Sequence, residues 1–206
     1  MLIAKIYDYK VIVNDKTDSK CKINFIMEQV MAKSKAVFFD RDGVINMDLS
    51  YVYKKEDFRF YDDFFACAMR FKKQGYKLVV VTNQSGIERG YYTIKDFLSL
   101  SAYMQDYMQE QMGFCFDRIY FCPLLHDTIR RKPANGMIIQ AMNDLDLDLS
   151  KSCLVGDRLT DIMAAKNAGI TKRYLLCRDK KHENSAELDK GEYTLIHTLD
   201  DFLPDN

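Results

Sequence analysis

Short, continuously apolar segments alternate along this chain with longer segments of helical periodicity. The apolar segments lack the regularly spaced polar residues of a strand with one face in solvent, which is typical of parallel strands buried on both faces. Five such segments occur: AVFFD (36–40), KLVVVT (77–82), RIYFC (118–122), SCLVGD (152–157) and KRYLLC (172–177). Strands of this kind with helices between them predict an α/β fold, a three-layer Rossmann-like sandwich with a central parallel sheet.

Two of the predicted helices have residues typical of helix termini at their ends. The segment 61–75 ends at Gly75, which suits a C-cap, and the amphipathic segment 93–113 begins at Thr93 and ends at Gly113. Further helices are expected near 136–145 and 159–168, and a weak strand with a short helix at 193–203. These connections are too short for an inserted domain, so no large cap domain is expected.

Length and charge limit the classes of protein to which the chain can belong. Its 206 residues suffice for one domain with a full hydrophobic core. Residues 1–34 fit the pattern poorly, so we expect an N-terminal appendage followed by one domain at 35–206. Lys and Arg total 30, as do Asp and Glu, and this balance gives no overall field to attract nucleic acid or a membrane surface.

Cysteine usage and hydropathy predict the compartment. The six cysteines are scattered, which favours free thiols in a reducing environment over a disulfide framework. No apolar run approaches the ~20 residues of a membrane span, and the N-terminal residues lack the pattern of a signal peptide. We therefore expect a cytoplasmic monomer without nucleic-acid or membrane partners.

Chemically useful side chains stand where three of the predicted strands finish. Asp40 and Asp42 come after the first strand, Thr82 and Asn83 close the second, and Asp157 closes the fourth. Ligands of open parallel sheets gather at the carboxyl ends of the strands. The sequence therefore predicts one site to which all of these residues contribute.

Three carboxylates at one sheet edge would repel one another unless a cation or a proton neutralised them. Oxygen ligands without nearby His or Cys favour Mg²⁺, which commonly also binds a substrate phosphate. Asp40 and Asp42 are two positions apart, so both can face one substrate, one attacking while the other moves protons. Thr82 offers a hydroxyl donor and Lys132 a compact positive charge, both suited to a phosphoryl group.

Four ordered motifs carry a resemblance to a known superfamily. The motifs are DxDGVIN (40–46), TNQSG (82–86), RKPxxGM (131–137) and VGDRxxD (155–161). They resemble those of the haloacid dehalogenase superfamily of phosphohydrolases. More narrowly, they are similar to the bacterial D,D-heptose 1,7-bisphosphate phosphatases and the related histidinol-phosphatases. The resemblance implies a Mg²⁺-dependent phosphomonoesterase that works through an aspartyl-phosphate intermediate.

The resemblance also implies a role for each matching residue. Asp40 would be the nucleophile, and Asp42 the general acid and then the general base. Mg²⁺ would be held by Asp40, Asp157 and the backbone carbonyl of Asp42. Thr82 and Lys132 would neutralise the transferring phosphoryl group. The residues that would contact the substrate are Asp48, Tyr51, Asn83, Gln84, Ser85, Arg131 and Arg158.

The resemblance leaves a choice of substrate. The leading one is D-glycero-D-manno-heptose 1,7-bisphosphate, which would lose its C7 phosphate during nucleotide-heptose biosynthesis. Histidinol phosphate is an alternative. A polynucleotide 3′-phosphate would need a basic groove, against which the balanced charge argues. A relative that only binds its ligand is disfavoured, because every motif position is intact.

One departure from the family pattern concerns zinc. Many members carry a zinc-binding loop with Cys-Pro-x-His and then Cys-x-Cys before the third motif. Here the stretch is CPLLHDTIRRKP, with a leucine at the histidine position and no cysteine at the two later positions. Cys122 and His126 are too few ligands for a structural site, so zinc is not expected.

Overall fold

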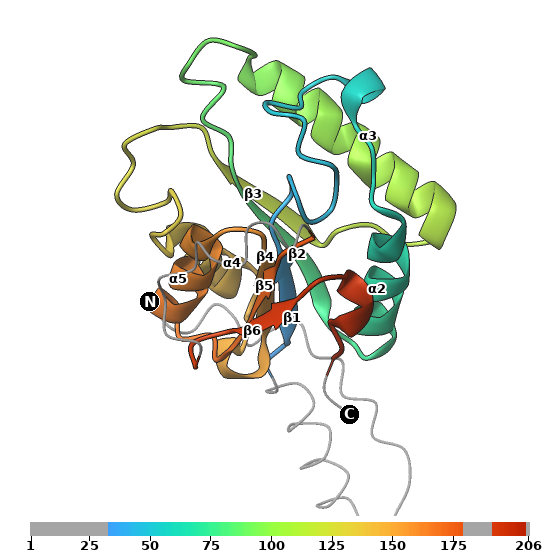
Figure 1. Cartoon of the computed structure of the whole chain (residues 1–206), viewed down its shortest axis with the longest axis vertical. Helices are drawn as coiled ribbons and strands as arrows, with labels where there is room; N and C mark the ends of the chain where they lie inside the picture. The colour runs from blue at the N-terminus through green and yellow to red at the C-terminus, as the bar shows by residue number, and fades with distance from the viewer. Residues whose placement is uncertain (1–32, 179–190, 205–206) are drawn as a thin grey trace, which may run out of the picture. The chain divides into compact units, whose positions relative to one another are not determined.

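The structure is a computed structural model, and it describes residues 33–178 and 191–204 (Figure 1). Most of the predicted appendage lies outside these residues and stays a prediction. One six-stranded sheet has the order β3-β2-β1-β4-β5-β6, and all neighbouring strands are parallel. The strands are β1 Ala36–Phe39, β2 Lys77–Asn83, β3 Arg118–Cys122, β4 Cys153–Gly156, β5 Lys172–Leu176 and β6 Thr194–Ile196. The predicted parallel sheet is confirmed.

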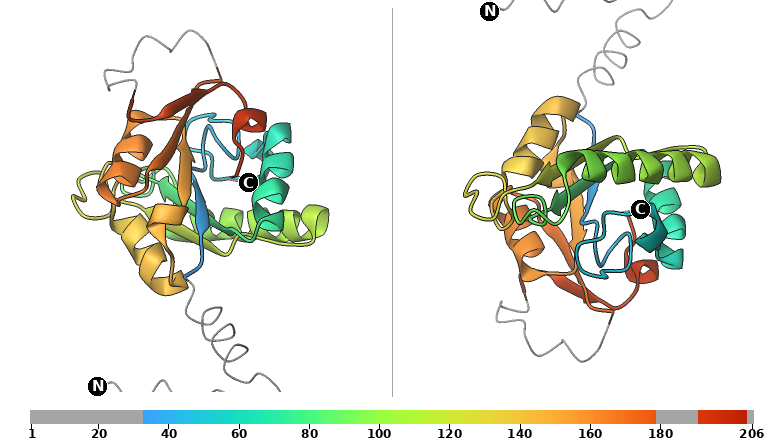
Figure 2. Two further views of the ribbon diagram at one scale, coloured as in Figure 1. Left: turned by 90° about the horizontal axis from the view of Figure 1, so that it is seen from below. Right: turned by 90° about the horizontal axis from the view of Figure 1, so that it is seen from above.

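Helices cover both faces of this sheet (Figure 2). Val37 of β1 packs in one core cluster with Phe64 of α2, whereas its neighbour Phe38 packs in the other with Ile138 of α4. Helices α2 and α3 thus lie on one face and α4 and α5 on the other, which confirms the three-layer sandwich. The helices are α2 Asp62–Lys73, α3 Ile94–Met112, α4 Gly136–Leu145 and α5 Leu159–Asn167, with 3-10 helices η1 Lys55–Asp57, η2 Leu149–Lys151 and η4 Leu199–Asp201.

The helix termini follow the expected capping chemistry. Thr93 and Asp96 form a capping box, in which the Thr93 amide donates to Asp96 Oδ2 at 2.8 Å. Gly113 and Gly75 both adopt positive φ angles, 74° and 77°, just beyond α3 and α2. Within the described residues, η1 is the only regular element in the loop from β1 to α2, so no cap domain is inserted there. No described helix is long and apolar enough to cross a membrane.

The strand order places the site. The sheet extends from β1 through β2 to β3 on one side and through β4 to β6 on the other, so the topology reverses between β1 and β4. Ligands of such sheets bind in the crevice at this switch point. Phe39 pairs in register with Val155, and the Asp40 amide donates to the Val155 carbonyl at 3.1 Å. Asp40 and Asp157 therefore leave neighbouring strands side by side.

Candidate active site

A buried lysine lies at the floor of this crevice. The Lys132 ammonium group is 2.8 Å from Asp40 Oδ1 and 2.6 Å from Asp161 Oδ1. It also donates to the Val81 carbonyl at 2.8 Å, so each of its three protons has an acceptor. Burial alone would lower the pKa of Lys132, but the carboxylates of Asp161 and Asp40 outweigh this effect and raise it. Lys132 therefore stays charged at neutral pH.

Asn83 fixes the backbone of that lysine. The Asn83 side-chain amide donates to the Lys132 carbonyl at 3.1 Å, and the Lys132 amide donates to Asn83 Oδ1 at 3.0 Å. This reciprocal pair ties the loop before α4 to the end of β2. Asn83, expected as a substrate contact, lines the pocket and also positions Lys132.

Three carboxylates converge beside Lys132. One oxygen each from Asp40, Asp157 and Asp161 lies within 4.8 Å of the other two. Oδ1 of Asp157 is buried and has no hydrogen-bond partner in the described part of the chain. Gly43 makes room for this carboxylate, because a Cβ there would lie 2.3 Å from Asp157 Oδ2. A buried, unpaired oxygen among hard oxygen donors fits a divalent cation such as Mg²⁺.

The same crowding disfavours ionisation of two of these groups. Burial raises the pKa of Asp40 to about 6, and repulsion from Asp161 and Asp42 adds to the effect against the opposing Lys132 charge. Burial, followed by repulsion from Asp40 and Asp161, raises the pKa of Asp157 to about 8. A bound cation would relieve the repulsion and favour the ionised forms.

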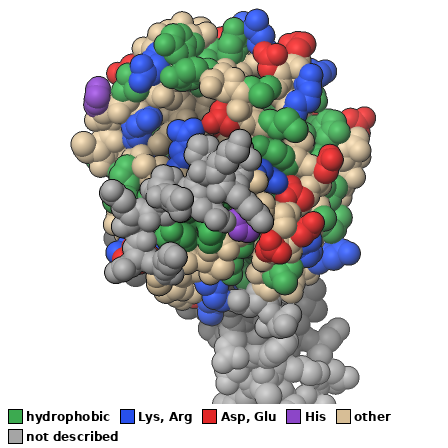
Figure 3. Space-filling model, in the orientation of Figure 1, with side chains coloured by type: hydrophobic (Ala, Val, Ile, Leu, Met, Phe, Trp, Pro, Cys, Tyr) green, Lys and Arg blue, Asp and Glu red, His purple; other side chains and the backbone are tan. Residues whose placement is uncertain are grey.

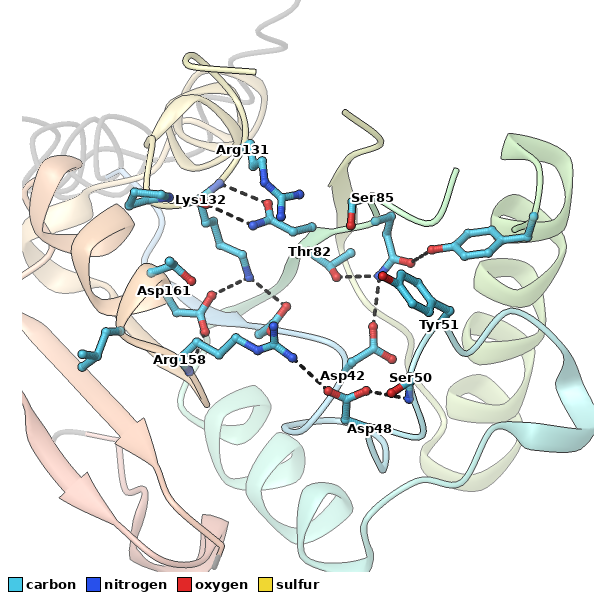
Figure 4. A pocket seen from close by; sticks show the side chains of 17 residues that line it. Asp42, Asp48, Ser50, Tyr51, Thr82, Ser85, Arg131, Lys132, Arg158 and Asp161 are labelled. Atoms are coloured by element: carbon cyan, nitrogen blue, oxygen red, sulfur yellow. Dashed lines mark hydrogen bonds and ion pairs between the residues drawn. The ribbon is translucent and has the colours of Figure 1, made fainter. Parts of the chain in front are cut away.

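The carboxylate of Asp42 has different partners. It accepts hydrogen bonds from Arg41 at 2.9 Å, from Asn46 at 3.0 Å and from Gln84 at 3.0 Å. The group expected from the sequence was Asp40, Asp42 and Asp157, whereas the structure places the Asp161 carboxylate beside Asp40 and Asp157. The side chain of Asp42 instead lies at the pocket wall (Figure 4), where it accepts the hydrogen bond from Gln84.

Sequence reasoning missed Asp161 as a site residue, although the motif GDRLTD ends with it. Its other oxygen accepts from the Arg158 amide at 3.0 Å, the pattern of an ordinary helix N-terminus, which hides the second role. Gly156 leaves room for the Asp161 side chain next to β4, because a Cβ at position 156 would lie 2.2 Å from Asp161 Cβ.

These groups open into a pocket of about 570 Å³ at the carboxyl edge of the sheet (Figure 4). The sequence-predicted residues that line it are Asp40, Asp42, Asp48, Tyr51, Thr82, Asn83, Gln84, Ser85, Arg131, Lys132 and Arg158. The lining residues that sequence reasoning did not single out are Ser50, Tyr92, Pro133, Leu159, Thr160 and Asp161. The pocket thus brings all four motifs together.

Two arginines stand near the pocket mouth. The Arg158 guanidinium pairs with Asp48 at 3.0 Å while its side chain stays 65% exposed. Arg131 donates to the Leu124 carbonyl at 3.2 Å. The segment that carries Asp48 continues into Ser50 and Tyr51, which have positive φ angles of 60° and 55°. Such backbone strain concentrates at functional sites.

The fold and the site together define a class. A parallel-sheet sandwich with an acidic, lysine-containing pocket at its switch point suits the transfer of phosphoryl groups.

Comparison with known proteins agrees. A family model described as HAD-hydrolase-like matches residues 129–202. The chain is 42% identical over 151 residues to the D-glycero-beta-D-manno-heptose-1,7-bisphosphate 7-phosphatase of Helicobacter pylori, covering 72% of this chain and 87% of that protein. It is 46% identical over 149 residues to the D-glycero-alpha-D-manno-heptose-1,7-bisphosphate 7-phosphatase of Campylobacter jejuni, covering 72% and 86%. The chain therefore belongs to the haloacid dehalogenase-like hydrolases, as its motifs predicted.

A solved structure supports the same assignment. The D,D-heptose 1,7-bisphosphate phosphatase from B. bronchiseptica, complexed with magnesium and phosphate, matches with a TM-score of 0.71 and 29% sequence identity. The match covers 80% of this chain and 93% of that one.

Proposed function

We propose that this protein is a Mg²⁺-dependent phosphomonoesterase that removes the C7 phosphate of D-glycero-D-manno-heptose 1,7-bisphosphate. The observation that carries the proposal is the cluster of Asp40, Asp157 and Asp161, within 4.8 Å of one another, beside a pocket that Asp40 and Lys132 line. Heptose bisphosphate phosphatases among its relatives, 42% and 46% identical, support the choice of sugar.

The chemistry follows from the positions of two aspartates. An oxygen of Asp40 attacks phosphorus, and the bond to the sugar oxygen breaks as Asp42 donates a proton to that oxygen. Asp42 then takes a proton from water, whose oxygen attacks phosphorus and breaks the bond to Asp40. Inorganic phosphate leaves, and both carboxyl groups return to their starting states.

The remaining groups bind the phosphoryl oxygens. Lys132, held in place by Asp161, offsets the negative charge of these oxygens, and the hydroxyl of Thr82 donates a hydrogen bond to them. Mg²⁺ would be held by Asp40, Asp157 and the backbone carbonyl of Asp42, and when bound it would offset negative charge on the transferring group.

The pocket mouth suits a substrate with a second phosphate. Arg131 and Arg158 can each offer parallel N–H donors to a phosphate that does not react. Asp48, Ser85 and Tyr51 line the same pocket, and we expect them to bind sugar hydroxyls. On the described part of the face in Figure 3, acidic, basic and hydrophobic side chains are intermixed, and this supports a small substrate over a nucleic-acid strand.

A phosphate-release assay tests the proposal. Heptose 1,7-bisphosphate, histidinol phosphate and a 3′-phosphorylated oligonucleotide are compared with Mg²⁺ and with a chelator. We expect rapid release from the heptose substrate with Mg²⁺ alone, and ³¹P spectra in which the C7 ester disappears while the C1 phosphate stays. Asp40→Asn should abolish release, whereas Asp106→Asn, an exposed residue of α3, should not.

The assay tests the choice of substrate and the mechanism independently. Faster hydrolysis of histidinol phosphate would overturn the sugar assignment and leave the class intact. Release that survives Asp40→Asn would overturn the aspartyl-phosphate mechanism.

A further inference from the structure

Tyr92 is linked by hydrogen bonds, through Gln84, to Asp42, the proposed general acid and base. Its hydroxyl, in a side chain that is 5% exposed, donates to Gln84 Oε1 at 2.5 Å. The other end of that amide, Gln84 Nε2, donates to Asp42 Oδ2 at 3.0 Å and to Thr82 Oγ1 at 2.8 Å (Figure 4). We propose that Tyr92 is a positioning residue that sets the geometry of Asp42 through Gln84. This inference rests on the role proposed above for Asp42.

The tyrosine hydroxyl decides which way the Gln84 amide points. If the amide rotated by half a turn, its carbonyl oxygen would face the Asp42 carboxylate and lose the hydrogen bond. Burial raises the pKa of Tyr92 to about 12, so its hydroxyl keeps its proton at neutral pH. A hydroxyl that donates to Gln84 Oε1 therefore keeps the NH₂ group directed at Asp42.

The ring of Tyr92 is held on two sides. It stacks on Tyr53 with 5.2 Å between ring centroids and 8° between planes. Gly86 lies against it so closely that an added Cβ would come within 2.2 Å of Tyr92 Cε1. The hydroxyl therefore has little freedom to leave Gln84.

A second chain of hydrogen bonds links Asp42 to the segment that carries Tyr53. The Val52 carbonyl, next to Tyr53, accepts from Arg41 Nη2 at 2.8 Å. That nitrogen also donates to Asp42 Oδ1 at 2.9 Å. Residues 52 and 53 thus support Asp42 through Arg41 on one side and through Tyr92 and Gln84 on the other.

The leaving group of the substrate distinguishes positioning from mere support of the fold. A sugar alkoxide needs a proton as it departs, so its rate depends on the placement of Asp42. The p-nitrophenolate ion leaves readily without a proton. Loss of the Tyr92 hydroxyl should therefore slow the hydrolysis of alkyl phosphates more than that of p-nitrophenyl phosphate.

The test compares Tyr92→Phe with Tyr91→Phe, the same change at an exposed neighbour. The comparison uses kcat/KM, which reports departure of the leaving group and excludes the later hydrolysis step that both esters share. We expect Tyr92→Phe to reduce kcat/KM on heptose bisphosphate roughly 10- to 100-fold and on p-nitrophenyl phosphate by much less. Tyr91→Phe should change neither. An equal loss on both esters, or none on the alkyl ester, would overturn the proposal.

A double-mutant cycle checks the route through Gln84. If Tyr92 acts through that amide, Tyr92→Phe should add nothing in a Gln84→Met background. Additive losses in kcat/KM would contradict this route. If Gln84→Met does not fold in a thermal melt, the leaving-group comparison decides alone.

The result is independent of the sugar assignment. If heptose bisphosphate proves not to be the substrate, the comparison is made on whichever alkyl phosphate the wild-type enzyme hydrolyses. Failure of the proposed sugar therefore leaves the Tyr92 result standing, and a wild-type enzyme that hydrolyses no alkyl phosphate overturns both.

Discussion

The ammonium group of Lys132 and a carboxylate oxygen of Asp161 lie 2.6 Å apart, and both side chains are buried. Removing one partner of a buried pair leaves the other charge uncompensated, at a cost of about 3–5 kcal/mol. We expect Lys132→Met to lower the free energy of unfolding by about 3 kcal/mol in Mg²⁺-free urea titrations and to abolish phosphate release.

Lys77→Met is the matched control for this change. Lys77 pairs with Asp117 at 3.0 Å but is 40% exposed, so solvent screens the pair and the loss should stay under about 1 kcal/mol. Equal destabilisation by the two variants would contradict the conclusion that Lys132 stabilises the fold through its buried ion pairs with Asp40 and Asp161.

Gly43→Ala should damage the proposed metal site specifically. Gly43 has a φ angle of +86°, and a Cβ there would displace the Asp157 carboxylate. Gly75 has a similar φ of +77° with no atom within 4 Å of an added Cβ, so Gly75→Ala carries the backbone strain alone. In Mg²⁺ titrations of phosphate release, we expect Gly43→Ala to weaken the apparent affinity about 10-fold or more and Gly75→Ala to leave it unchanged.

Stabilisation by Mg²⁺ should grow with pH. Asp157 and Asp40 have pKa values raised from 3.8 to about 8 and about 6, so the metal-free folded state binds more protons than the unfolded chain in this window. The stability of the metal-free protein therefore falls as the pH rises from about 4 to about 8. Mg²⁺ would bind the deprotonated carboxylates and so offset this loss.

Melting curves with and without Mg²⁺ measure that effect. The rise in Tm on adding Mg²⁺ should be larger near pH 8.5 than near pH 5.5, and Asp157→Asn should reduce it. A rise that is the same at both pH values would count against a carboxylate site for the metal.

Arg158→Ala should act on binding more than on stability. The exposed ion pair with Asp48 is worth at most about 1 kcal/mol, so Tm should change little. If Arg158 binds the second phosphate as proposed, its loss should raise KM about 10-fold with kcat nearly unchanged. Lys151→Ala, which removes a 69% exposed partner of Asp148, is the control and should alter neither constant. A fall in kcat at constant KM would instead place Arg158 in the chemical step.

The layers of this fold could be predicted because each buried strand is a continuous apolar run. Val37 and Phe38 face opposite core clusters, so neither position of β1 tolerates a polar residue. The order of the strands could not be predicted, since an apolar run carries no information about which neighbour it pairs with. That order, set by packing, is what brings Asp157 beside Asp40.

The candidate site could be predicted in part. Motif residues at strand ends reveal themselves by position, and the eleven lining residues expected from the sequence include Asp40 and Lys132. Asp161 was missed because the first turn of a helix gives an aspartate an ordinary explanation. Tyr92 was missed because its contact with Gln84 depends on how the loop after β2 folds back.

The paired hydrogen bonds between Asn83 and the backbone of Lys132 hold the position of this lysine, proposed to be catalytic, independently of the loop before it. Because these hydrogen bonds fix the Lys132 backbone to the end of β2, residues 123–131 can vary in length and composition without moving the lysine. Changes in this segment can therefore reshape the entrance to the pocket while the cluster of Lys132, Asp40 and Asp161 keeps its geometry.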